Sequence, residues 1–320
     1  MTARVLFAAR PERWPDYRER LPAALAEAGV DAEVVTLEDA PDPATVDWVV
    51  YAPNSALQDF GPYARLKGVL NLWAGVEDVE GNRTLTAPLC RMVDEGLTRG
   101  MVEWVTGHVL RHHLGMDAHV ANPDRTWDAT APPLATGRPV AMLGLGALGA
   151  ACAEALARLG FPVTGWSRGP KDVPGVRSVT GADGLRDALG GADIVVLLVP
   201  HTRSTEDLMD AERLAWMRPG AVLLNPGRGA LVVEDALLAA LDRGHLSHAT
   251  LDAHRVEPLP EGHPFWAHPK VTVTPHIASA TRPATAVRVL AENVRRGEAG
   301  EPLLHVVDRT EALAPAGPPA

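Results

Sequence analysis

The chain has 320 residues, of which 46% are hydrophobic and 22% are charged, and this length and composition suit a globular protein of two domains. Its formal net charge of −10 argues against nucleic acid or an anionic membrane as a partner, because either would repel it. The N-terminal segment MTARVLFAAR does not resemble a signal peptide. The only two cysteines, Cys90 and Cys152, cannot build a disulfide framework, and we expect both as small core residues of a cytoplasmic protein.

Short apolar runs alternate with helical stretches over residues 1–99. Strands are predicted at residues 4–8, 32–36, 48–52 and 68–73, and a helix at 14–28 that ends before Gly29, a residue typical of helix ends. This alternation indicates an open parallel sheet with covering helices.

A second alternating set follows a helical pattern at residues 101–114 and an irregular stretch that runs to Gly137. Its short runs of Val, Leu and Ile are typical of strands buried on both faces. These strands are predicted at residues 140–143, 162–166, 194–199, 221–225, 249–252 and 271–274. Helical segments are expected to fill the gaps between them, such as those at 147–159 and 233–243, and a last helix is predicted at 283–296. We expect the Ala- and Pro-rich tail after Thr310 to be disordered.

A GxGxxG pattern directly follows the apolar run at residues 140–143. Its candidate cofactor-binding residues are Gly144, Gly146, Ala147, Leu148 and Gly149. The pattern alone is weak in a chain with 29 glycines, and an ordinary glycine-rich turn is the alternative. Its place between a strand and an Ala-rich helix favours a dinucleotide site, where the helix N-terminus holds the pyrophosphate.

The choice of dinucleotide is expected to depend on the end of the next strand. That strand ends in Ser167 and Arg168, with Lys171 close by, and offers no carboxylate to a ribose hydroxyl at that point. A hydroxyl and a guanidinium suit a 2′-phosphate, so we predict that NADP(H) is preferred and that NAD(H) is possible. The alternative is that Arg168 is an ordinary solvated side chain.

Three chemically suited residues follow late strands of the second set. Arg228 comes after the strand at 221–225, Glu257 after that at 249–252 and His276 after that at 271–274. The carboxyl ends of parallel strands share one edge of the sheet, so the three side chains are predicted to converge. An arginine that grips a carboxylate, and a histidine kept charged by a carboxylate, suit the reduction of a 2-oxo acid. Taken singly, each is more often structural or solvated.

The motifs GLGALG, NPGRGALVVEDALLAAL, LDAHRVEPLP, HPFW and VTVTPHIAS, in this order, resemble the D-isomer-specific 2-hydroxyacid dehydrogenase family. WSRGPKDVPGV and ATRPATAV resemble its glyoxylate/hydroxypyruvate reductase A branch. The resemblance implies an α/β fold of two Rossmann-like domains with parallel sheets. A flavodoxin-like substrate domain would comprise residues 1–99 and 284–320, and an NAD(P)-binding domain residues 100–283.

The resemblance also implies roles for individual residues. Arg228 would anchor and polarise the substrate, His276 would be the proton donor beside the cofactor, and Glu257 would support His276. Asp252 would contact the nicotinamide carboxamide, and Pro200, with Thr205 nearby, would line the cofactor cleft. The substrates implied are glyoxylate and hydroxypyruvate, reduced with NADPH to glycolate and D-glycerate.

A loop of the first domain is implied to bind the substrate carboxylate through backbone amides. Here the donors would be Ala74 and Gly75. Trp73 stands where the branch usually has glycine, and Glu77 where it often has Asp, which puts the exact substrate in doubt. Tyr51 is a further pocket candidate for which a core role is equally plausible.

Residues 101–137 resemble the family's dimerisation arm, so a homodimer is expected. His108, His112 and His113 lie on its helix, and we assign them to a solvated or interface face rather than to a metal. Two alternatives to a glyoxylate and hydroxypyruvate reductase stay open: a dinucleotide-sensing binding protein of the corepressor kind, and a family enzyme with another substrate.

Overall fold

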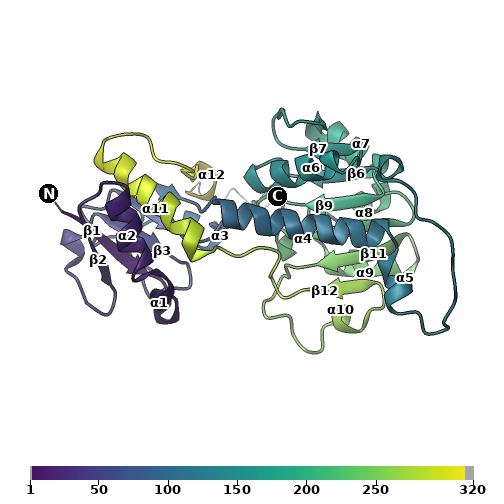
Figure 1. The fold of residues 1–320 in the computed structure, drawn as a ribbon, viewed down its shortest axis with the longest axis horizontal. Coiled ribbons are helices and arrows are strands. Elements are labelled where there is room, and N and C mark those ends of the chain that lie inside the picture. The colour runs from purple at the N-terminus through teal and green to yellow at the C-terminus, as the bar shows by residue number, and fades with distance from the viewer. Residues whose placement is uncertain (1, 314–320) are drawn as a thin grey trace, which may run out of the picture. The chain divides into compact units, whose positions relative to one another are not determined.

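The computed structural model describes residues 2–313, and the chain divides into two compact units. Unit 1 comprises Met1–Leu97 and Thr281–Ala320, and unit 2 comprises Thr98–Ala280 (Figure 1). The crossings predicted after residues 99 and 283 fall beside these boundaries. Each unit contains one parallel sheet, which confirms the predicted α/β fold class. Within residues 2–313, no helix is long and apolar enough to cross a membrane.

The sheet of unit 2 has seven strands in the order β12-β11-β10-β9-β6-β7-β8, and every adjacent pair is parallel. The strands are β6 (Val140–Leu143), β7 (Val163–Trp166), β8 (Val176–Val179), β9 (Ile194–Leu197), β10 (Ala221–Asn225), β11 (Leu246–Leu251) and β12 (Val271–Val273). The strand order reverses between β6 and β9. In such folds the crevice outside the carboxyl ends of the strands at this reversal binds ligands.

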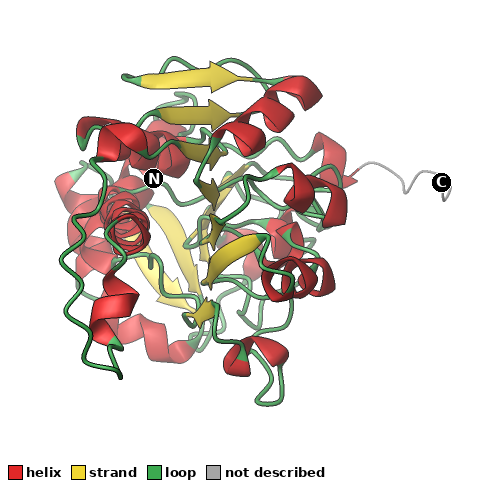
Figure 2. Ribbon diagram, turned by 90° about the vertical axis from the view of Figure 1, so that its right-hand side faces the viewer, coloured by secondary structure: helices red, strands yellow, loops and turns green. Residues whose placement is uncertain are grey.

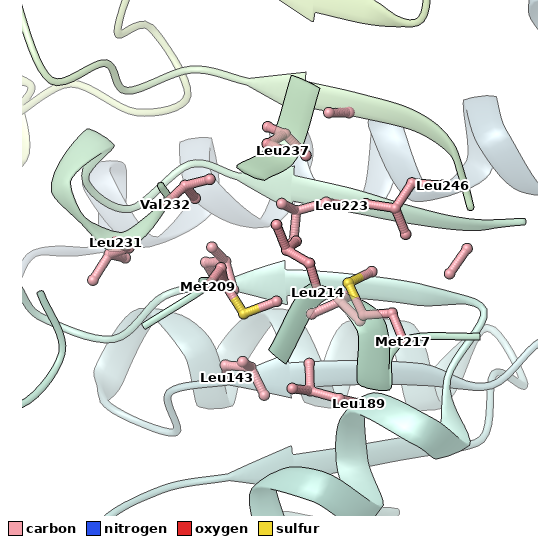
Figure 3. Packing of buried hydrophobic residues seen from close by; sticks show 14 of the residues in the cluster. Leu143, Leu189, Met209, Leu214, Met217, Leu223, Leu231, Val232, Leu237 and Leu246 are labelled. Carbon is pink, nitrogen blue, oxygen red and sulfur yellow. The ribbon is translucent and has the colours of Figure 1, made fainter. Parts of the chain in front are cut away.

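Helices cover this sheet on both faces, and each face has its own core. The helices are α4 (Glu95–His113), α5 (Met116–Val120), α6 (Ala147–Arg158), α7 (Gly181–Gly191), α8 (Ala211–Trp216), α9 (Glu234–Asp242) and α10 (Pro264–Ala267). Along β6, Ala141 and Leu143 pack with residues of α7, α8 and α9, whereas Val140 and Met142 pack with α4 and α6. This alternation is the strand period of two, and it explains why the run is apolar throughout. Figure 2 shows the strands flanked by helices, and Figure 3 the first core.

The sheet of unit 1 has five parallel strands in the order β2-β1-β3-β4-β5. The strands are β1 (Ala3–Ala8), β2 (Ala32–Thr36), β3 (Trp48–Tyr51), β4 (Gly68–Asn71) and β5 (Leu89–Cys90), and the helices are α1 (Trp14–Tyr17), α2 (Arg20–Glu27), α3 (Glu77–Glu80), α11 (Pro283–Glu298) and α12 (Thr310–Leu313). The indole of Trp48 fits against Gly297, and its Nε1 donates to Glu298 at 2.8 Å. This contact fixes α11, from the end of the chain, to the N-terminal sheet.

Three local predictions differ from the structure. The single helix expected at residues 14–28 is divided into α1 and α2. Pro22 explains this break, because it has no N–H to donate within a continuous helix and is tolerated only in a first turn. The tail after Thr310 begins with α12, and its remaining residues, 314–320, lie outside the described residues. Strands β5 and β8 and the short helices α3, α5 and α10 were not predicted, and α7 and α8 lie in gaps between predicted strands where helices were expected without stated bounds.

Both cysteines are free and lie in cores, Cys90 at 1% exposure and Cys152 at 0%. Burial raises the pKa of Cys90 to about 11 and that of Cys152 to about 12. Their thiols therefore stay protonated near neutral pH, as expected of small core residues.

Candidate active site

The glycine pattern forms a tight turn between β6 and α6. Gly144 has a φ of +111°, and a Cβ added there would lie 2.4 Å from the carbonyl oxygen of Leu198, in the segment that follows β9. A Cβ on Gly149 would lie 1.8 Å from the carbonyl oxygen of Gly144. Any side chain at either position would push the turn away from β9 or the helix away from the turn. Glycine is required at both positions for this close packing.

Gly146 serves a different purpose, because a Cβ there would meet no atom within 4 Å. It is the residue before the first turn of α6, and no side chain caps that helix. The N–H groups of the first turn, which include those of Ala147 and Leu148, have no carbonyl acceptor within the helix. The result is open space in front of a positive helix end, at the reversal of strand order. These residues fit the pyrophosphate of a nicotinamide dinucleotide.

The residues expected to select the dinucleotide follow β7. Ser167 is 8% exposed, and its hydroxyl donates to the carbonyl of Gly169 at 2.7 Å. Arg168 and Lys171 are exposed, and within residues 2–313 the guanidinium of Arg168 has no hydrogen-bond or ion-pair partner. The serine therefore shapes the loop, while the arginine is available to an anion.

Pro200 and Thr205 lie in the segment that follows β9. The hydroxyl of Thr205 donates to the carbonyl of Pro200 at 2.6 Å, and it accepts from the N–H of Thr202 at 2.8 Å. This network folds the segment back on itself next to the glycine turn, to which Leu198 and Val199 are already close. The expected contact of Pro200 with the cofactor stays a prediction.

His276 and Glu257 are brought together by the loops after β12 and β11. Nδ1 of His276 lies 2.7 Å from Oε2 of Glu257, and Oε1 of the same carboxylate accepts from the N–H of His254 at 2.8 Å. Burial alone would raise the pKa of Glu257, but these two hydrogen bonds outweigh it and hold the pKa below its usual value. The His276 side chain is 45% exposed, so its other ring nitrogen is accessible to a reactant.

Asp252 holds the backbone that carries His276. Its carboxylate is fully buried and accepts from the Thr274 hydroxyl at 2.5 Å and from the N–H groups of Ile277 and Ala278 at 2.9 and 2.8 Å. The N–H of His276 donates to the Asp252 carbonyl at 2.8 Å. His276 itself has a φ of +53°, a conformation that such residues adopt only when their surroundings impose it. The anchoring role is visible in the structure, whereas a contact with the nicotinamide carboxamide stays a prediction.

Arg228 lies on the neighbouring loop, after β10. Asn225, the last residue of β10, donates to the Arg228 carbonyl at 2.8 Å and accepts from the Gly227 N–H at 3.1 Å. A Cβ on Gly229 would lie 2.0 Å from the carbonyl carbon of His254. The loop of Arg228 therefore packs directly on the loop that carries Glu257, and unit 2 brings the predicted trio to one edge of its sheet.

In unit 1, Asn71 organises the loop after β4 in the same way. Its buried side-chain amide donates to the carbonyls of Trp73 and Gly75 at 3.0 and 2.8 Å. The carbonyl and the following N–H of a trans peptide point in opposite directions, so the N–H groups of Ala74 and Val76 point away from Asn71. Within the described residues, the N–H groups of positions 74–76 have no acceptor. Three such groups in succession suit a carboxylate.

Sequence reasoning named Ala74 and Gly75 but missed Val76 and both asparagines. A signal was present, since each of the apolar strands GVLN and AVLLN ends in Asn. Trp73 is 39% exposed beside the loop. Tyr51 is 1% exposed and packs on Phe60, so the structure shows it in the core, and a pocket role stays a prediction.

We expected the three histidines of α4 on a solvated or interface face, and the structure rules out the solvated one, because none of the three is exposed; an interface role stays a prediction. Nε2 of His112 lies 2.9 Å from the hydroxyl of Thr250, in β11, and its ring contacts that of His248. His113 is 6% exposed. The reason is that α4 packs on a face of the sheet, where its Val105 and Val109 belong to the same core as the strand residue Met142. Among the described residues, no group of three or more His, Cys, Asp and Glu side chains could hold a metal ion.

Comparison with known proteins decides the family. A sequence profile described as D-isomer specific 2-hydroxyacid dehydrogenase, NAD binding domain, matches residues 106–278. The chain belongs to this family. It is 38% identical over 274 residues to a glyoxylate/hydroxypyruvate reductase A of Serratia proteamaculans, a match that covers 83% of this chain and 87% of that protein. The predicted family and its reductase A branch are thereby confirmed, as is the class of NAD(P)-dependent dehydrogenase.

Solved structures of the family agree over nearly the whole chain. A D-isomer specific 2-hydroxyacid dehydrogenase of Xanthobacter autotrophicus Py2, in complex with NADPH and MES, is 39% identical with a TM-score of 0.90, over 98% of this chain and 100% of that one. An NADPH-dependent glyoxylate/hydroxypyruvate reductase of Sinorhizobium meliloti, in complex with NADP and sulfate, is 33% identical with a TM-score of 0.85, over 97% of this chain and 100% of that one. Together with the glycine turn, they support a nicotinamide dinucleotide as the cofactor of this chain.

Proposed function

We propose that this dehydrogenase reduces small 2-oxo acids, glyoxylate and hydroxypyruvate among them, to 2-hydroxy acids with NADPH. The observation that carries the proposal is the pairing of His276 with Glu257 on a loop packed against that of Arg228. The relatives named as glyoxylate/hydroxypyruvate reductases support these substrates.

When bound, the reduced dinucleotide supplies a hydride to the carbonyl carbon. The carbonyl π electrons pass to the oxygen, which takes a proton from His276 and becomes a hydroxyl, so the substrate gains two electrons and the histidine becomes neutral. Glu257 orients the ring and favours its charged form before transfer. Arg228 binds carboxylate and carbonyl oxygens and stabilises the negative charge that develops. The N–H groups of residues 74–76 bind the substrate carboxylate.

The proposed preference for NADPH depends on Arg168, with Lys171 as a second cation and Ser167 as the residue that shapes the loop. The guanidinium is exposed and unpaired within residues 2–313, as a group that receives a 2′-phosphate needs to be. The two solved relatives bound to NADPH and NADP support the same preference.

We also propose a homodimer built on the arm at residues 101–137. Three large apolar side chains on it are strongly exposed, Val120 at 85%, Trp127 at 94% and Leu134 at 78%. Such a group usually marks an interface. The proposed location is the cytoplasm, where the free thiols of both cysteines stay reduced. The mass in solution, measured by light scattering, tests the dimer, and a monomer would contradict it.

The test of the function is turnover of glyoxylate, hydroxypyruvate and larger 2-oxo acids, followed by the loss of NADPH absorbance. The expected result is turnover with at least one of the two small acids and a higher kcat/KM with NADPH than with NADH. Tight NADPH binding without turnover of any acid would instead favour a dinucleotide-sensing protein. Turnover restricted to larger acids would reject the small substrates but retain the reaction.

A further inference from the structure

Unit 1 contains a cavity of about 560 Å³ that the proposed reaction does not use. It lies where β1, β2 and β3 end, and its lining includes Arg10 after β1, Glu38 after β2 and Ser55 after β3. None of the substrate-binding candidates, Tyr51 and residues 73–76, lines it. Those loop residues follow β4, on the far side of β3 from β1.

The position of the cavity in the sheet is the first argument that it binds a ligand. In the order β2-β1-β3-β4-β5, the chain places β2 on one side of β1 and β3 on the other, so the strand order reverses at β1. Sheets of this order bind their ligands at the carboxyl ends of β1 and β3. The volume also falls within the range of small-molecule sites, and a two-carbon acid would fill only a small part of it.

The walls of the cavity indicate what kind of group fits. Phe7 and Trp14 both line it, and their ring centroids lie 5.1 Å apart. Trp14 is only partly buried, so part of its ring is open to a partner. Ala9, Leu37 and Ala56 complete an apolar lining. A flat ring would gain both buried apolar area and aromatic stacking here.

Two polar groups in the cavity indicate that the ligand carries a negative charge. Ser55 is 6% exposed, and its oxygen accepts from the N–H of Leu57 at 3.1 Å, while its hydroxyl proton has no acceptor within residues 2–313. Arg10 also lines the cavity, and among residues 2–313 its guanidinium has no hydrogen-bond or ion-pair partner. A buried donor and an unpaired cation in one cavity suit a carboxylate or a phosphate. The carboxylate of Glu38 lies on the β2 side of the cavity and repels an anion there, so the anionic group of a ligand should bind at the end near Arg10.

We propose that this cavity is a second ligand site, which binds a flat aromatic ring that carries one anionic group. The ring lies against Trp14, and the anionic group receives hydrogen bonds from Arg10 and Ser55. Its binding is independent of the reduction chemistry, because it uses none of the residues assigned to that reaction.

The test is calorimetric titration of the full chain in saturating NADP⁺, which occupies the dinucleotide site. Four probes separate the contributions: adenosine 5′-monophosphate, adenosine, indole-3-acetate and acetate. We expect at least one ring anion to bind, with adenosine and acetate at least about 10-fold weaker, as expected from loss of a charged hydrogen bond or of stacking. The tighter of the two ring anions identifies phosphate or carboxylate as the preferred group.

Variants then locate the site. Arg10→Ala should weaken the ring anion about 10-fold or more and leave adenosine unchanged, and Trp14→Leu should weaken the ring anion and adenosine alike. Arg13→Ala is the matched control, because Arg13 is exposed nearby, pairs with Asp16 and does not line the cavity. Arg10 is exposed, so its removal should not affect folding, and Arg10→Gln provides a second variant. Absence of binding by either ring anion, equal loss in the Arg13 variant, or loss in Arg228→Ala instead would each overturn the proposal.

Discussion

Nδ1 of His276 lies 2.7 Å from Oε2 of Glu257, and the two residues come from loops that follow different strands. Neither loop is free to move independently, since Asp252 holds one and the N–H of His254 holds the carboxylate of the other. The pair is therefore positioned before any ligand arrives. Proton transfer at a fixed ring orientation is what such an arrangement favours.

Replacement of His276 by Ala should lower kcat on the order of 10²-fold or more, because the proton donor is lost. The matched control is His268→Asn, since His268 lies before β12, at the other end of the strand. Its ring contacts the exposed carboxylate of Asp242 and accepts from the N–H of Lys270 at 3.1 Å, and it takes no part in the proposed reaction. Steady-state kinetics with glyoxylate and NADPH measure both. Near-normal turnover in the His276 variant would refute its role.

Glu257→Gln should lower kcat/KM on the order of 10-fold and change its dependence on pH, because the amide cannot favour the charged imidazole. The pKa of Glu257 is held below its usual value, so its charge is present above that value and is lost only as the pH falls through the lowered pKa. The wild type should therefore keep this contribution down to mildly acidic pH. A profile of kcat/KM against pH provides the measurement, with the exposed Glu261→Gln as control. An unchanged profile in the Glu257 variant would contradict the pairing.

Arg228→Lys keeps the charge but loses the paired geometry of the guanidinium. We expect kcat/KM to fall about 10- to 100-fold, the range for loss of a charged hydrogen bond, with effects on both KM and kcat. Arg228→Ala should be worse than Arg228→Lys. If Arg228→Lys and Arg228→Ala lowered kcat/KM equally, a positive charge without the guanidinium geometry would contribute nothing at this position.

Arg168→Ala should reduce kcat/KM for NADPH about 10-fold or more and leave the value for NADH unchanged, because only the 2′-phosphate loses a partner. Arg243→Ala is a suitable control, since Arg243 is exposed and lies at the end of α9, away from this loop. An equal loss with both cofactors would show that Arg168 supports the loop and does not select the phosphate.

His112 and His248 should make the fold sensitive to acid. Burial lowers the pKa of His112 to about 3 and that of His248 to about 4. Below about pH 6.5 these two histidines bind protons in the unfolded chain but stay neutral in the folded chain. The free energy of unfolding is therefore at its maximum above that pH and declines toward pH 4. The free energy of unfolding, measured by denaturant titration, should fall over this window by on the order of 5 kcal/mol. His248→Gln should flatten the decline, whereas the exposed His119→Gln should not; a flat wild-type curve would argue against the effect.

Sequence patterns predicted the strands that are buried on both faces. Continuous apolar runs such as Val140–Leu143 and Ala221–Asn225 can be recognised as strands without knowing which strands lie beside them. They missed β8, whose residues Arg177 and Ser178 give a mixed pattern at the edge of the sheet, and the two-residue β5. Charge and strand position sufficed to bring His276 and Glu257 together. The hydrogen bonds of Asp252 and Asn71 depend on how distant loops fold back, which spacing along the chain does not encode.

Gly146 has no side chain that could cap helix α6, so the first N–H groups of the helix have no side-chain acceptor, and this has a thermodynamic consequence. We expect the bound dinucleotide to offer acceptors to the bare N–H groups of the first turn, so that the ligand completes the helix. Folding and cofactor occupancy are then linked, and the melting temperature should rise with the concentration of free dinucleotide. A low concentration of free dinucleotide would then lower the stability of the protein as well as its rate of turnover.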